Sequence, residues 1–91
     1  MDRRRQLYEE LKQRPRNVRF DELTDLMKLW DYEQYLMAIG RTGLFVHKLF
    51  GVDWVGVTIP AEGEPVLETC VSDCFASIED VIELEESDNV H

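Results

Sequence analysis

Cysteine and histidine are scarce in this sequence. Cys70, Cys74, His47 and His91 are the only residues of these two types among 91. The cysteines lie four residues apart in a predicted helix, which places them on one face but holds their Cβ atoms too far apart for a good disulfide. A metal site would need further ligands, and neither histidine lies near the cysteines in sequence. We therefore predict two buried core thiols, no metal site and no cofactor.

Long apolar runs are also missing, and none is long enough to cross a bilayer. The basic residues of the first five positions are not followed by the apolar segment of a secretory signal. The length and the composition are those of one small globular domain. We expect a single domain over residues 1–91, no membrane association and a cytoplasmic location.

Positive charge is concentrated toward the N-terminus of the chain. No lysine or arginine follows Lys48, whereas ten acidic residues follow Pro60, and the formal net charge is −9. An acidic protein repels nucleic acid on average. Seven of the ten basic residues lie within the first nineteen positions: Arg3, Arg4, Arg5, Lys12, Arg14, Arg16 and Arg19. This basic arm could touch phosphate, improve solubility or contact an acidic partner.

Three short apolar runs lie in the middle of the chain, at residues 35–39, 44–46 and 54–59. They are rich in β-branched and aromatic residues and are separated by glycine-containing segments at 40–43 and 51–53, a pattern typical of strands joined by turns. We predict a three-stranded antiparallel meander within residues 32–60. Gly40 and Gly43 flank its first turn and allow a backbone with positive φ there. Any chemistry is expected at that turn.

Helical spacing of apolar residues precedes and follows the meander. It predicts helices over residues 2–13, 17–30 and 69–86, with Asp31 in the left-handed conformation that often ends a helix. Residues 87–91 are expected to fray. The element order is α-α-β-β-β-α, an α+β fold with helices on one face of an antiparallel sheet. Whether the first helix packs on the body or projects from it stays open.

This order resembles the HicA family of bacterial toxins, whose fold is similar to a double-stranded RNA-binding domain. The match covers residues 14–86, most of the chain. The residues that carry it are RPRNVRFDEL at 14–23, LWDY at 29–32, Gly40, LFVH at 44–47, VTIP at 57–60 and the last helix. The resemblance divides the chain into an N-terminal helix or arm at 1–14, a HicA-like core at 15–86 and a tail at 87–91.

The resemblance implies metal-independent cleavage of mRNA, blocked when a HicB-type antitoxin binds. The family uses a histidine as general acid or base, in a Gly-Ser-His-His signature that opens the second strand. Here the signature falls on residues 40–43, and Thr42 occupies the position of the catalytic histidine. A threonine hydroxyl is a poor proton carrier near neutral pH. No catalytic residue is therefore assigned, and the site at Thr42 is interpreted as degenerate.

His47 is the remaining candidate for the proton carrier. Side chains alternate along a strand, so Thr42 and Leu44 share one face while Phe45 and His47 share the other. His47 is therefore predicted to point away from the position that Thr42 marks. We interpret it as a structural or solvated histidine, and His91 as a tail residue.

Active family members also carry lysine and arginine in the loop and last helix that could hold RNA, but residues 63–86 carry no positive charge here. With the proton carrier missing too, we predict a non-catalytic, HicA-like protein that acts through protein–protein interaction. Its partner is expected to be a HicB-like antitoxin, a second copy, or a basic surface that the acidic last helix contacts.

Two alternatives stay open. The first is an active mRNA-cleaving toxin or RNA-binding protein, neutralised by a HicB-like antitoxin. It would use Thr42 or His47 as the reactive group, and its candidate phosphate contacts are Arg41, Arg14, Arg16 and Arg19. The second is a structural domain whose function is unrelated to the family, because a fold does not fix a function.

Overall fold

The computed structural model describes residues 2–37 and 40–88. The elements follow in the predicted order, which confirms the α+β class. They are α1 (Arg3–Lys12), α2 (Phe20–Leu29), β1 (Tyr32–Leu36), β2 (Thr42–His47), β3 (Val55–Thr58) and α3 (Glu68–Asp88). The end of the first predicted strand, Ala38 and Ile39, lies outside the described residues, as does His91. None of the described helices is both long enough and apolar enough to span a membrane.

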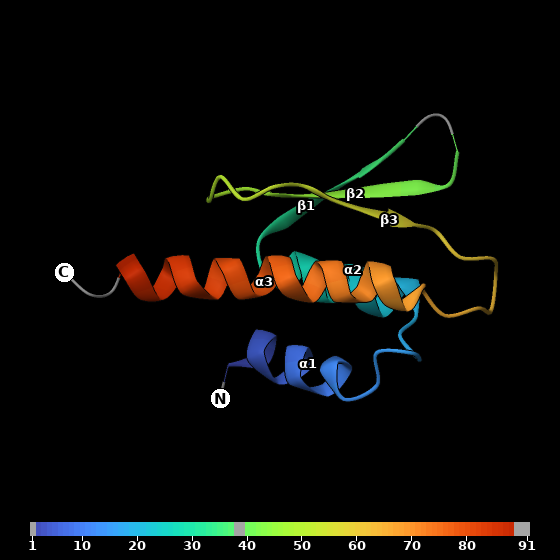
Figure 1. The fold of residues 1–91 in the computed structure, drawn as a ribbon, viewed down its shortest axis with the longest axis horizontal. Coiled ribbons are helices and arrows are strands. Elements are labelled where there is room, and N and C mark those ends of the chain that lie inside the picture. The colour runs from blue at the N-terminus through green and yellow to red at the C-terminus, as the bar shows by residue number, and fades with distance from the viewer. Residues whose placement is uncertain (1, 38–39, 89–91) are drawn as a thin grey trace.

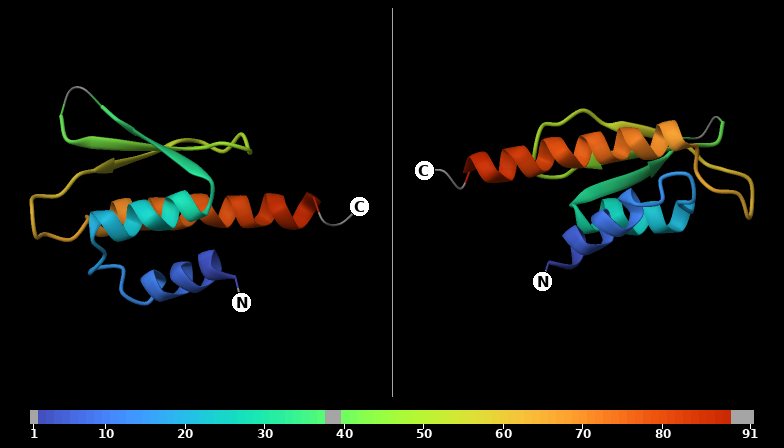
Figure 2. Two further views of the ribbon diagram at one scale, coloured as in Figure 1. Left: turned by 180° about the vertical axis from the view of Figure 1, so that it is seen from behind. Right: turned by 60° about the horizontal axis from the view of Figure 1, so that its bottom comes forward.

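The three strands form one antiparallel sheet in the order β1-β2-β3, with Tyr35 opposite Leu44 and Leu44 opposite Gly56. All three helices lie on the same side of the sheet (Figure 1). Helices α2 and α3 lie next to it, and α1 lies beyond them (Figure 2). In the described part of the chain no helix lies on the other side of the sheet, and this arrangement leaves one strand face open.

Helix α1 packs on the body, which resolves the question that the sequence left open. Tyr8 and Leu11 are buried, and the Tyr8 ring packs edge-on against Trp30 and Phe75. The indole Nε1 of Trp30 donates a hydrogen bond to the backbone carbonyl of Arg4 at 3.1 Å. Thus α1 contributes part of the core rather than a free arm.

The first strand begins earlier than its apolar run suggests. Asp31 has φ 69°, the predicted left-handed conformation, and reverses the chain directly after α2. Tyr32 can then enter the sheet at once, where its buried hydroxyl shares a hydrogen bond with Ser77. Burial raises the pKa of Tyr32 to about 12. Leu36 and Met37, predicted as the middle of the strand, instead lie at its exposed end.

Two helix boundaries also differ from those that the apolar periodicity predicts. Helix α2 starts at Phe20 rather than Asn17, because the carbonyl of buried Val18 accepts a hydrogen bond from the N–H of Val66 at 2.8 Å and holds that stretch extended. Helix α3 continues through Asp88, so the fraying predicted from residue 87 was wrong for the first two residues.

The cysteine prediction was right for only one of the two thiols. Cys74 is buried, whereas Cys70 is half-buried at the margin of the core, and both are free. Burial raises the pKa of the Cys74 thiol to about 12. Such a thiol is a packing group and a poor nucleophile.

Candidate functional site

The turn between β1 and β2 holds the position expected to carry chemistry. Gly40 has φ +80°, as predicted, but Gly43 has no positive φ and is buried close to the Phe20 ring. The carbonyl of Arg41 accepts a hydrogen bond from the N–H of Ile59 at 2.6 Å, and that of Thr42 accepts one from the N–H of Met37 at 3.0 Å. The backbone at Thr42 is therefore fixed by pairing on both sides.

Thr42 lies on the side of the sheet that no helix covers. It is half-buried, as is Leu44 two residues later, whereas Phe45 between the helices and the sheet is fully buried. A Cβ atom built on Gly56 would lie 3.5 Å from the Trp54 ring, 3.7 Å from Leu44 Cδ2 and 3.9 Å from Thr42 Cγ2. These side chains therefore converge over Gly56, where the missing side chain leaves room for the indole.

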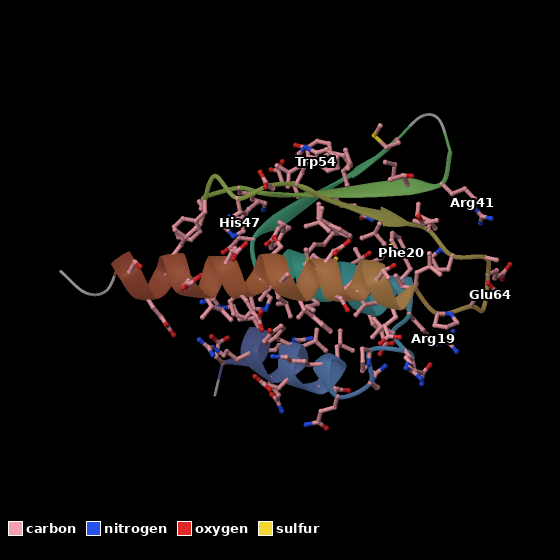
Figure 3. The ribbon with its side chains drawn as sticks, viewed as in Figure 1. Arg19, Phe20, Arg41, His47, Trp54 and Glu64 are labelled. Atoms are coloured by element: carbon pink, nitrogen blue, oxygen red, sulfur yellow. The ribbon has the colours of Figure 1, made fainter. Side chains whose placement is uncertain are left out.

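We call this surface the open face. Its Trp54 side chain is 65% exposed, and Figure 3 shows it on the side of the sheet opposite the helices. Tyr35, 51% exposed, donates a hydrogen bond to Glu33 at 2.5 Å. The open face consists of Glu33, Tyr35, Thr42, Leu44, Val46, Trp54, Gly56 and Thr58. Its centre is apolar and aromatic, and it contains no imidazole.

His47 lies at the other end of β2 and on the core side, as the alternation predicted (Figure 3). It is 6% exposed, and its Nδ1 accepts hydrogen bonds from the N–H groups of Leu49 at 3.1 Å and Phe50 at 3.0 Å. Its ring packs edge-on against Tyr32 and stacks on Phe50. It lies five residues after Thr42 along the strand, a distance of roughly 16 Å. His47 is a structural residue that orders the turn after β2.

Burial is the main cause that lowers the pKa of His47 below its usual value of 6.5. A histidine whose pKa is lowered by folding contributes stability above the pKa of the unfolded chain, and this is lost as the pH falls. We expect the melting temperature to fall as the pH is lowered from 7.5 to 5. In His47→Asn, which keeps an acceptor but does not titrate, the decrease should be smaller. Thermal unfolding monitored by circular dichroism checks this, and equal decreases in both proteins would contradict it.

The basic arm is paired with carboxylates of the chain itself. Four of its cations contact acidic residues of α3: Arg4 with Glu85 at 2.5 Å, Arg5 with Glu86 at 3.8 Å, Lys12 with Glu79 at 3.2 Å and Arg16 with Glu68 at 3.0 Å. These cations of the arm therefore contact carboxylates of the last helix of the same chain. The pairs of Arg5, Lys12 and Arg16 are exposed and add little stability, so their main effect is to neutralise charge, whereas the Arg4–Glu85 pair is half-buried and bidentate.

The four arginines predicted to contact RNA do not form one cluster of free cations. Arg14 pairs with Glu22 at 2.6 Å and donates to the Asn17 carbonyl at 2.7 Å, and this ion pair lowers the pKa of Glu22. Figure 3 places exposed Arg41 at the hairpin and Arg19 below the start of α2. An RNA-binding role for these residues therefore stays a prediction.

Within residues 2–37 and 40–88, no three histidine, cysteine, aspartate or glutamate side chains are grouped so that they could hold a metal ion.

The sequence analysis missed the exposure of the Trp54 side chain, because the apolar pattern predicted only that Trp54 belongs to a strand. The glycine two residues later was the available signal, since a small residue on a strand often marks the close approach of another group.

No protein-family model, curated protein or solved structure matches the chain.

Proposed function

We propose that the chain is a non-catalytic, HicA-like interaction protein that acts by binding another protein. The observation that carries the proposal is the separation of the two candidate groups. Thr42 occupies the open face, where a reacting ribose would need an imidazole, while His47 faces the core and uses Nδ1 to accept two backbone hydrogen bonds. An imidazole held in this way cannot shuttle a proton to a substrate on the other face.

The surface composition also supports binding of protein rather than RNA. The open face presents aromatic Tyr35 and Trp54 around half-buried Leu44 and Val46. Aromatic side chains are enriched in protein interfaces, where they supply large contact areas at a low entropic cost. Most cations of the arm are neutralised by carboxylates, which weakens any hold on a polyanion.

The resemblance to HicA proteins makes a HicB-like antitoxin the first partner to test. The proposal includes a cytoplasmic location. A second copy of the chain is another partner that the sequence suggested. Sedimentation of the purified protein tests it, because a chain that pairs with itself sediments as a dimer without any antitoxin.

We expect the purified protein to leave mRNA intact. Without a positioned imidazole, general acid–base catalysis loses about 10²–10⁴-fold in rate. The measurement is the integrity of a defined transcript over hours, with an active HicA toxin as positive control. Thr42→His restores an imidazole to the open face as a gain-of-function variant.

Cleavage by Thr42→His alone would show that only the proton carrier is missing, and the wild-type chain would still be non-catalytic. Cleavage by the wild-type protein that disappears in Thr42→Ala or His47→Ala would overturn the proposal. Growth arrest on expression, accompanied by loss of cellular mRNA, would do the same.

A further inference from the structure

Strand β3 has a free edge. It pairs with β2 on one side, and within the described residues no strand pairs with its other side. In an antiparallel ladder, alternate residues direct both backbone groups toward the partner strand. Because the N–H of Ile59 donates to the Arg41 carbonyl, the backbone groups of Gly56 and Thr58 point away from β2. These donors and acceptors are available to a further strand.

A groove runs between this edge and α3. Residues 53–56 line it on the side of the strand, and Asp73, Ala76, Ser77 and Asp80 line it on the side of the helix. Three carboxylates line it: Asp53 before the strand, and Asp73 and Asp80 on the helix. None of the three forms an ion pair in the described part of the chain, in contrast to the carboxylates of α3 that face the arm.

We propose that the β3 edge binds an extended, lysine- or arginine-rich segment of a partner protein, which adds a fourth strand to the sheet. This deepens the proposed function and depends on it, since it names the chemistry of the partner. Side chains alternate along an added strand. One set would lie over the groove, where ammonium or guanidinium groups meet Asp73 and Asp80. The other set would lie on the open face beside Trp54 and Gly56.

Charge selects this occupant over a second copy. Pairing of two β3 edges would bring Asp53, Asp73 and Asp80 of one molecule against the same residues of the other. Like charges placed opposite each other are destabilising, and the net charge of −9 opposes self-association further. A basic strand instead neutralises carboxylates that form no ion pair with residues 2–37 or 40–88.

The test uses a synthetic peptide of alternating lysine and valine, seven residues long, with acetylated and amidated ends. Trp54 reports its binding because the other tryptophan, Trp30, is fully buried. We expect a blue shift of the Trp54 emission that saturates with peptide, weakens with salt and is lost in Trp54→Phe. The same peptide with alternate amides N-methylated keeps its charge but cannot pair, and we expect it not to bind.

Asp73→Lys/Asp80→Lys should weaken peptide binding about tenfold or more. The matched control is Glu9→Lys/Glu64→Lys, which changes the net charge equally on exposed residues of α1 and of the loop before α3. We expect its affinity to stay within about twofold of the wild type. Circular dichroism establishes that both double variants are folded.

Three outcomes of the peptide titration would overturn the inference: equal weakening by both double variants, undiminished binding of the N-methylated peptide, or no binding. A blue shift of Trp54 with rising protein concentration alone would show that a second copy occupies the edge, which also overturns it. Its failure is distinguishable from that of the proposed function, which fails if the wild-type chain cleaves RNA or if its expression arrests growth with loss of cellular mRNA. An inactive chain that ignores the peptide would refute strand addition alone.

Discussion

Phe45→Ala is expected to lower the free energy of unfolding by about 3–5 kcal/mol. Phe45 is fully buried at the centre of β2, the middle strand, on the face that α2 and α3 cover. Truncation removes an aromatic ring from the core and leaves a cavity between the sheet and the helices that the backbone cannot close. Urea unfolding followed by circular dichroism measures the change.

Leu44→Ala is the matched control, since Leu44 adjoins Phe45 in β2 but lies half-buried on the open face. Its truncation should cost about 1 kcal/mol, because water already reaches much of the side chain. Similar losses for both variants would mean that the sheet does not distinguish a core face from an open face, and the assignment of Thr42 to the open face would fail with it.

Leu11→Ala should be nearly as disruptive, with a loss of about 2–5 kcal/mol. Leu11 is fully buried, and its helix packs on the side of α2 and α3 away from the sheet. If α1 is part of the core, the variant unfolds at lower urea concentration in a single transition, because α1 and the sheet unfold together.

Glu9→Ala tests the same helix on its exposed side, and its stability should stay within about 0.5 kcal/mol of the wild type. A Leu11→Ala protein as stable as the wild type would show that α1 is detached in solution. Loss of α1 helicity in a separate, earlier transition would show that it folds independently of the sheet.

The parts of this fold that the sequence predicts are governed by local rules. Alternation along β2 placed His47 and Thr42 on opposite faces, and only residues within that strand were needed. Asp31 follows the apolar periodicity of α2 directly, and few residue types other than glycine and asparagine tolerate the left-handed conformation there better than aspartate. Apolar periodicity likewise identified α3.

The parts that the sequence left open or missed depend on residues far apart in sequence. The apolar stripe of α1 is thin, and its docking depends on Tyr8 meeting Trp30 and Phe75. The late start of α2 depends on a hydrogen bond between Val18 and Val66. The groove combines Asp53 with Asp80, from a strand edge and a helix whose juxtaposition no local pattern specifies.

Because the basic arm pairs with carboxylates on one side of α3, the charge of the molecule is distributed asymmetrically. Carboxylates beside α1 are matched by arginine and lysine, while those beside β3 are not. Such an asymmetry orients a protein as it approaches a positively charged surface, before any contact is made. On an anion-exchange resin the chain would thus be held by its β3 flank, with the N-terminal helix turned toward the solvent.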